Sequence, residues 1–373
     1  MHKKFSLSLI LTVVFILSAC VKSPTQTPST SPTSELPTLP PVVTSTQVQL
    51  PTVSSPTGSA STPTLQPAGE LPDISKDNYI DDRSTPAALM LSYFNAINLQ
   101  EYLRAYSYSS DTPNLGTFDQ FSKGYSDTQS VTVSFGLITQ EGAAGSTYYT
   151  VPMILNSVLT NGTPQKFAAC YVLRLPEPGN YGAPPITPMH IEQRDAKAVA
   201  AGTTDSDTLS TICQSLNMPV GAMGGAAKVE PYDDISSTNY LDNRSDPVMV
   251  IKSYLNAINK QQYVRAYSYF QDTTTAYSTF EAQNTKIQSV SAQFGTVTSD
   301  PGAGQIYSTV PAVVDTTYTD GTRQVFAVCY TLHISQPSIQ ATPPFQPLGI
   351  KTITSTPAAA GADSATLLAS ACQ

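Results

Sequence analysis

The sequence contains no tryptophan, three histidines and few charged residues. Charged side chains make up 12% of the chain, against roughly 25% in an ordinary globular protein. The formal net charge is −8, and lysines and arginines do not cluster into a basic run. Nucleic-acid binding needs clustered cations, so the composition argues against a nucleic-acid partner.

Long hydrophobic runs are also scarce, and the one at the N-terminus is too short to span a bilayer comfortably. Lys3 and Lys4 precede the apolar stretch 5–17, and two small residues then lead to Cys20. A basic start, a short apolar segment and small residues are typical of a signal peptide. Because these residues resemble the bacterial lipobox, we predict a signal peptide over 1–19 and lipidation at Cys20. The alternative is an ordinary signal peptide with a chance cysteine.

The segment 20–76 consists mainly of Pro, Ser and Thr after the lipidated cysteine. Such a composition buries too little apolar surface to offset the entropy of ordering the chain. We therefore predict a disordered stalk that lifts the rest of the chain off the membrane. Two or three acyl chains suffice for stable anchoring. The expected location is extracytoplasmic, anchored by lipid to the cell membrane or envelope.

The remainder of the chain contains one unit twice. DNYIDDRSTP at 77–86 matches TNYLDNRSDP at 238–247, and SYFNAINLQEYLRAYSYS at 92–109 matches SYLNAINKQQYVRAYSYF at 253–270. Further matches continue to the last residue at a nearly constant offset, which chance cannot produce. The predicted organisation is a first α+β domain or repeat (77–214), a Gly- and Pro-containing linker (215–237) and a second α+β domain or repeat (238–373).

Four further cysteines are divided between the two repeats. Cys170 and Cys213 are separated along the chain by the same distance as Cys329 and Cys372. This equality favours one disulfide within each repeat, each worth roughly 4 kcal/mol by chain entropy. A metal site formed by all four cysteines is the rival interpretation, and it lacks the close CxxC pair that such sites use.

Each repeat begins with a helical pattern. Thr85 and Asp246 directly precede a proline and are predicted N-caps. One apolar helical face follows in each repeat, formed by Met90, Tyr93, Phe94 and Ile97 in the first and by Ile251, Tyr254, Leu255 and Ile258 in the second. Two shorter helices are expected after this one.

Strand patterns follow the helices. Val131, Val133 and Phe135 alternate with polar residues, as strand residues do. Two longer strands are expected on either side of Asn161-Gly162, and Asp320-Gly321 takes that place in the second repeat. Both dipeptides supply the positive φ of a tight hairpin turn. A short helix that carries the second cysteine is expected to close each repeat. Because helices and strands are segregated along each repeat, we predict the α+β fold class.

The motif SYFNAINLQEYLRAYSYS, a third short helix and a curved antiparallel sheet together resemble the nuclear-transport-factor-2-like superfamily, also called SnoaL-like or cystatin-like. The resemblance covers about the first hundred residues of each repeat. It implies two tandem cone-shaped domains, in which N-terminal helices pack on a bent antiparallel sheet and leave a pocket. Ketosteroid isomerases and polyketide cyclases of that superfamily use an Asp or a His–Asp pair inside the cone. No His–Asp pair is duplicated here, which puts such an activity in doubt.

Tyrosines recur at seven equivalent positions of the two repeats, and arginines and aspartates recur at two each. As candidate lining of a ligand pocket we single out Tyr93, Arg104, Tyr106, Tyr108, Tyr254, Arg265, Tyr267 and Tyr269. The two arginines could anchor an anionic ligand, but they could instead stack on tyrosines or pair with Asp111 and Asp272. The tyrosines could equally be core residues with their hydroxyls at the rim. Asp81 and Asp242 are expected to cap the first helix or to pair with Arg83 and Arg244.

No catalytic motif of known spacing appears in the sequence, and we predict no catalytic residue, cofactor or metal site. The leading hypothesis is a non-catalytic cell-surface lipoprotein that binds a small molecule, a peptide or an envelope component. An isomerase- or cyclase-type enzyme is the first alternative, and it requires a carboxylate that faces into the cone. A structural spacer is the second alternative, and filled cones in both repeats would favour it.

Overall fold

The computed structural model describes residues 73–75, 78–110, 115–199, 203–221, 223–225, 234–359 and 361–373. All of these lie within one compact unit, Ser61–Gln373. The predicted signal peptide, the lipidation site Cys20 and almost all of the predicted stalk lie outside the described residues. Among the residues described, no helix has the length and apolar character needed to cross a membrane.

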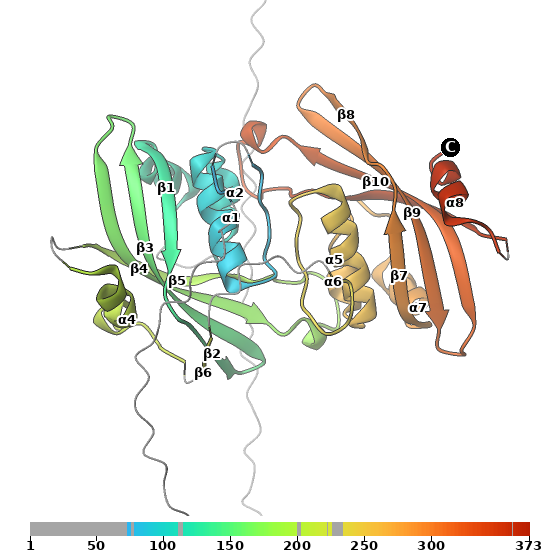
Figure 1. Ribbon diagram of the computed structural model, residues 1–373, viewed down its shortest axis with the longest axis horizontal. Coiled ribbons are helices and arrows are strands. Elements are labelled where there is room, and N and C mark those ends of the chain that lie inside the picture. The colour runs from blue at the N-terminus through green and yellow to red at the C-terminus, as the bar shows by residue number, and fades with distance from the viewer. Residues whose placement is uncertain are drawn as a thin grey trace, which may run out of the picture. The chain divides into compact units, whose positions relative to one another are not determined.

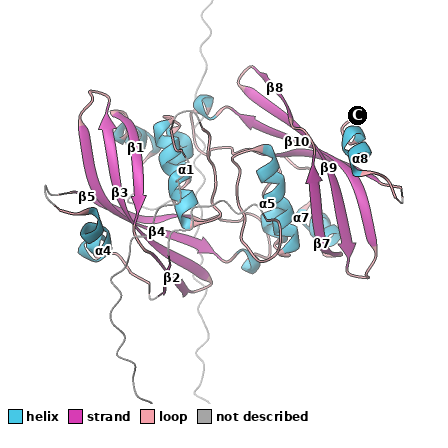
Figure 2. Cartoon of the chain, viewed as in Figure 1, coloured by secondary structure: helices cyan, strands magenta, loops and turns pink. Residues whose placement is uncertain are grey.

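Both repeats consist of helices followed by antiparallel strands (Figures 1 and 2), which confirms the predicted α+β class. The first repeat and the segment after it contain α1 (Pro86–Asn98), α2 (Tyr102–Ser107), α3 (Phe118–Gly124), β1 (Thr128–Phe135), β2 (Ile138–Ala143), β3 (Ser146–Leu159), β4 (Pro164–Pro176), β5 (His190–Ala198), α4 (Asp205–Ser215) and β6 (Met223–Gly225). The second repeat contains α5 (Pro247–Asn259), α6 (Tyr263–Tyr267), α7 (Tyr277–Asn284), β7 (Ile287–Phe294), β8 (Thr298–Gly302), β9 (Gln305–Tyr318), β10 (Arg323–Ser335), β11 (Gly349–Pro357) and α8 (Ser364–Ser370).

The two repeats form separate sheets in which equivalent strands pair in the same way. The first sheet runs β5-β4-β3-β2-β6, with β1 also paired to β3, and the second runs β11-β10-β9-β7, with β8 also paired to β9. Thus β1 and β2 both pair with β3, as β7 and β8 both pair with β9. The segment 223–225, inside the predicted linker, forms β6 and pairs with β2. Part of the chain between the repeats therefore completes the first sheet.

Local sequence signals explain where α1 and α5 begin. The side chain of Thr85 accepts a hydrogen bond from the backbone N–H of Ala88, and Asp246 does the same for Met249. In each helix a proline occupies the first turn, where its missing N–H costs nothing. The predicted N-caps are confirmed.

Alternating side chains on β3 and β4 give the first sheet two different faces. Val151, Met153 and Tyr171 belong to the cluster that packs against α1, whereas Ile154 and Cys170 belong to the cluster that packs against α4. Helices α1 and α4 accordingly cover opposite faces of this sheet, as α5 and α8 do on the second sheet (Figure 1).

Aromatic side chains fill the space between α1 and the first sheet. The ring of Tyr93 lies 4.9 Å from that of Phe94 and 6.2 Å from that of Tyr171, centroid to centroid. Tyr93 and Phe94 are both buried. The second repeat packs Tyr254, Leu255 and Tyr330 at the equivalent place.

The β3–β4 and β9–β10 hairpins turn where the sequence predicts. The positive φ falls on the glycine in each case, +82° at Gly162 and +83° at Gly321. The preceding Asn161 and Asp320 keep negative φ and accept a hydrogen bond from the backbone N–H two residues on, at 3.0 and 2.9 Å. One left-handed residue is typical of a type I turn followed by a bulge.

Both predicted disulfides are present. Cys170 joins Cys213 and Cys329 joins Cys372, each across a sequence separation of 43. Cys213 lies within α4, whereas Cys372 follows the last residue of α8. Disulfides form and persist in oxidising compartments, which indicates an extracytoplasmic location.

Candidate functional site

The two repeats meet along a short pair of antiparallel segments, 81–84 and 242–245, which we call the junction. The backbone N–H of Arg83 donates to the carbonyl of Asp242 at 2.7 Å, and that of Arg244 donates to the carbonyl of Asp81 at 2.6 Å. The contact is reciprocal, because equivalent residues of the two repeats exchange equivalent bonds. Such reciprocity is the property of an isologous interface.

Serine side chains extend the same reciprocal pattern. The hydroxyl of Ser245 accepts the backbone N–H of Asp81, and the hydroxyl of Ser84 accepts that of Asp242, both at 2.9 Å. The junction backbone is therefore hydrogen-bonded by both main chain and side chain, as buried polar groups must be.

Tyrosines add an exchange of apolar contacts across the junction. Tyr79, from the first repeat, packs against the hydrophobic cluster of the second repeat. Tyr240, its equivalent, packs against the cluster of the first repeat. Each repeat thus contributes one aromatic side chain to the other's core.

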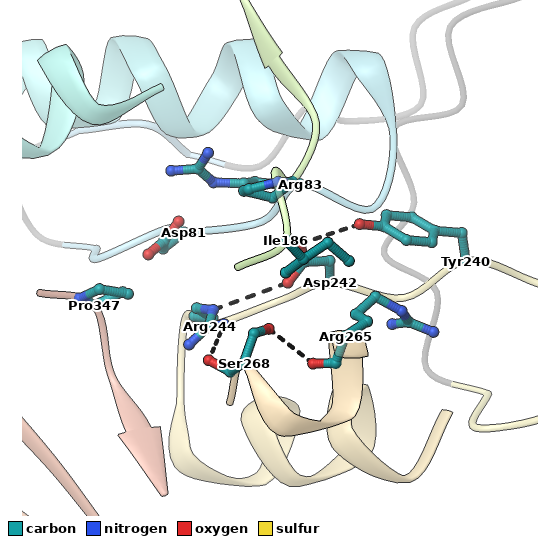
Figure 3. A pocket seen from close by; sticks show the side chains of 10 residues that line it. Asp81, Arg83, Ile186, Tyr240, Asp242, Arg244, Arg265, Ser268 and Pro347 are labelled. Atoms are coloured by element: carbon teal, nitrogen blue, oxygen red, sulfur yellow. Dashed lines mark hydrogen bonds and ion pairs between the residues drawn. The ribbon is translucent and has the colours of Figure 1, made fainter. Parts of the chain in front are cut away.

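A cleft of about 210 Å³ opens beside the junction and is lined by both repeats. Figure 3 shows residues of the first repeat along one side and residues of the second repeat along the other. The ten lining residues are Asp81, Arg83, Ile186, Pro188, Tyr240, Asp242, Arg244, Arg265, Ser268 and Pro347.

The two carboxylates of the cleft are each held by tyrosine hydroxyls. Asp81 accepts from Tyr108 at 2.7 Å, and Asp242 accepts from Tyr269 at 2.9 Å and from Tyr240 at 3.2 Å. Neither aspartate caps a helix, contrary to one of the two expected roles. The other role is found at Asp242, whose carboxylate lies 3.9 Å from Arg244.

The cleft arginines have matching surroundings in the two repeats. Arg83 lies over the ring of Tyr108, and Arg244 over that of Tyr269, at 4.4 and 4.5 Å from the centroid. Arg83 also donates to the carbonyls of Met189 and Ser107. These contacts fix both guanidinium groups at the edge of the cleft.

Arg104 and Arg265 are buried and take the stacking role expected as one alternative. Arg104 lies over Tyr79 and Arg265 over Tyr240, at 4.5 and 4.8 Å. Arg104 also pairs with Glu101 at 2.6 Å. The alternative pairing with Asp272 is wrong for Arg265, because Asp272 is exposed and pairs with Lys351 at 2.7 Å. Asp111 lies outside the described residues.

The predicted pocket residues do not gather around one cavity. Arg265 lines the cleft, whereas Tyr93, Tyr108, Tyr254 and Tyr269 are buried in the packed interior. The remaining tyrosines, which are partly buried, donate to loop carbonyls: Tyr106 to Gly116 and Tyr267 to Thr275. Arg104, on α2, is buried and does not line the cleft.

Burial controls the protonation of the groups at the junction. It raises the pKa of Asp82 to about 6, against the opposing effect of hydrogen bonds from Ser84. Burial, with the nearby charge of Asp81, also raises the pKa values of Tyr79 and Tyr108. Both tyrosines therefore remain neutral donors at physiological pH.

The buried carboxylates in the described part of the chain are Asp81, Asp82 and Asp242. All three belong to the junction rather than to the interior between α1 or α5 and its sheet. Within the same residues, no group of three or more His, Cys, Asp and Glu side chains could hold a metal ion. The chain matches no protein-family model, no curated protein and no solved structure.

Sequence reasoning did not identify the junction as a site, although a signal was present. The motif Asp-Asp-Arg-Ser at 81–84 recurs as Asp-Asn-Arg-Ser at 242–245. Its position before a helix suggested capping, because local patterns cannot show that two copies of a segment pair with each other. Ser84, Ser245, Asp82 and Asn243 were missed for this reason.

Proposed function

We propose that the chain is a non-catalytic, lipid-anchored cell-surface protein that binds its ligand in the cleft between its two repeats. In this proposal Cys20 carries the lipid anchor and residues 20–76 form the stalk. The repeats are tandem domains of the nuclear-transport-factor-2-like kind, with the cone interiors serving as cores rather than as pockets.

One observation carries this proposal. The cleft is lined by charged side chains from both repeats, whereas aromatic side chains occupy the space under α1 and α5. Concave sites with a few convergent polar groups are the usual places for ligands. A site lined by both repeats would also require the duplication for function.

The size and charge of the cleft favour a small polar ligand over an apolar one. Its volume of about 210 Å³ falls below the roughly 300–1,000 Å³ of sites for drug-sized molecules. The cleft is lined by three arginines and two aspartates, an excess of one positive charge, and Arg83 and Arg244 offer donors suited to a carboxylate. A peptide terminus or a small organic acid of the envelope fits these requirements.

Native mass spectrometry of residues 73–373, purified from the protein's own host, tests the proposal. We expect a small bound molecule that the double variant Arg83→Gln/Arg244→Gln loses. Arg323→Gln is the matched control, since Arg323 is exposed and pairs with Asp315 away from the cleft. A ligand retained by the double variant, or lost equally by the control, would place the site elsewhere.

A spacer is the second candidate, and the packed interiors of both repeats favour it. In that role the second repeat would add reach and no recognition. Absence of any bound molecule from host-purified protein, together with unchanged cell-surface behaviour of the Arg83→Gln/Arg244→Gln variant, would support the spacer. The enzyme alternative has less support, because the buried carboxylates lie at the junction.

A further inference from the structure

The junction contains one position at which the two repeats differ in a chemically important way. Residue 82 is aspartate and the equivalent residue 243 is asparagine, within motifs that are otherwise Asp-x-Arg-Ser in both repeats. Asp82 and Asn243 face each other as a bridge pair. They are 4% and 5% exposed, so water does not separate them.

The backbone brings these two side chains close together. The bonds from Arg83 to Asp242 and from Arg244 to Asp81 flank the pair on both sides. Residues placed in this way form a non-hydrogen-bonded antiparallel pair, the kind with the shorter Cα separation and the closer side chains. Asn243 Nδ2 accordingly donates to Asp82 Oδ2 at 3.1 Å.

Each side chain also makes a local bond that fixes its orientation. Oδ1 of Asp82 accepts the backbone N–H of Ser84, and Oδ1 of Asn243 accepts that of Ser245, both at 2.8 Å. Since Oδ1 is used locally in both repeats, the second atom of each side chain must point at the partner. That second atom is an acceptor in Asp82 and a donor in Asn243.

Identical residues at the two positions would lose this match. Two aspartates would place carboxylate oxygens against each other without water, and two asparagines would place two NH2 groups against each other. Two buried carboxylates avoid repulsion only by sharing a proton, and two facing NH2 groups leave donors unpaired, so both arrangements cost stability. The remaining hydrogen bonds of the junction are reciprocal, so they fit like and unlike repeats equally well.

We infer that Asp82 and Asn243 determine which repeats pair at the junction. The pair favours first-with-second pairing and disfavours first-with-first or second-with-second pairing between two copies of this chain. An attractive contact for the correct partner and an unpaired contact for the wrong one is how specificity is usually achieved. The inference does not depend on any ligand in the cleft.

A cleaved chain tests this directly. A recognition site for a sequence-specific protease is inserted between Gly225 and Asp234 of the full chain, and cutting there leaves the halves joined by non-covalent contacts alone, because both disulfides lie within a repeat. Association of the halves is measured by light scattering and native mass spectrometry over a dilution series. The variants are Asn243→Asp, Asp82→Asn and the exchange Asp82→Asn/Asn243→Asp, which preserves composition and net charge.

We expect wild-type halves to stay together as first–second pairs. Each single variant should weaken association by about tenfold or more, and the exchange should restore it to within about threefold of wild type. Should a single variant fail to fold by circular dichroism of the uncut chain, recovery of folding in the exchange variant supports the inference in the same way. Separation of the wild-type halves, abundant like-with-like pairs, or an exchange variant as weak as the singles would overturn it.

Discussion

Removal of the two disulfides one at a time should affect their helices differently. The variants are Cys170→Ala/Cys213→Ala, which frees α4, and Cys329→Ala/Cys372→Ala, which frees α8. Both disulfides span a sequence separation of 43. Removal of either raises the chain entropy of the unfolded state and should lower the free energy of unfolding by about 4 kcal/mol. The global loss of stability is therefore expected to be similar in the two variants.

The local contacts of the two helices are not similar. Leu209 and Ile212 of α4 are 7% and 1% exposed and pack against Ile154 on the outer face of the first sheet. Helix α8 has no buried residue, and its Leu367 and Leu368 are half-buried. Full burial of two such aliphatic side chains contributes about 3–6 kcal/mol. Helix α4 should remain docked without its disulfide, and α8 should not.

Hydrogen–deuterium exchange with mass spectrometry distinguishes these outcomes. We expect peptides from 364–370 to lose nearly all protection in the Cys329→Ala/Cys372→Ala variant. Peptides from 205–215 should keep about a hundredfold protection or more in the Cys170→Ala/Cys213→Ala variant. Equal loss of protection in both helices, or a protected α8 after its disulfide is removed, would refute the argument from burial.

Three further outcomes follow from single residues. Burial raises the pKa of Asp82 to about 6 from 3.8, so the folded state binds this proton more tightly than the unfolded chain does. The free energy of unfolding should therefore fall by about 2 kcal/mol between pH 4 and pH 7 in urea unfolding, and the Asp82→Asn variant should lack this decline. The side chain of Asn98 hydrogen-bonds the carbonyl of Ile74 and both the N–H and the carbonyl of Val131. The Asn98→Ala variant should therefore lose about 3 kcal/mol of unfolding free energy in the same urea experiment, and a loss below 1 kcal/mol would contradict this. Cys20→Ala should abolish incorporation of a labelled fatty acid and release the protein from membranes; retained label would disprove lipidation at that residue.

Much of the fold was predictable because each local sequence pattern occurs in both repeats and could be compared between them. Equal spacing of the cysteines identified the pairing, and Thr85 and Asp246 marked the start of a helix in both repeats. These features depend on residues close in sequence or on comparison of the copies. The strand β6 was not predicted, because the Gly-rich segment 223–225 carries no strand pattern and is ordered by the free edge of β2.

The site was less predictable than the fold. Tyrosine and arginine recur at helical spacing both when they line a pocket and when they fill a core, and only packing separates the two cases. Tyr93 and Tyr108 are buried, and their hydroxyls bond Tyr125 and Asp81. The cleft instead depends on how segments 81–84 and 242–245 meet, which is a long-range property that no local pattern encodes.

The position of each disulfide bears on how the protein would respond to enzymes that cut exposed chains at a cell surface. The exposed stretch 182–185 lies between Cys170 and Cys213, and the exposed stretch 341–344 lies between Cys329 and Cys372. A break in either stretch leaves both pieces covalently tied through sulfur. Such damage nicks the molecule without shedding any part of it.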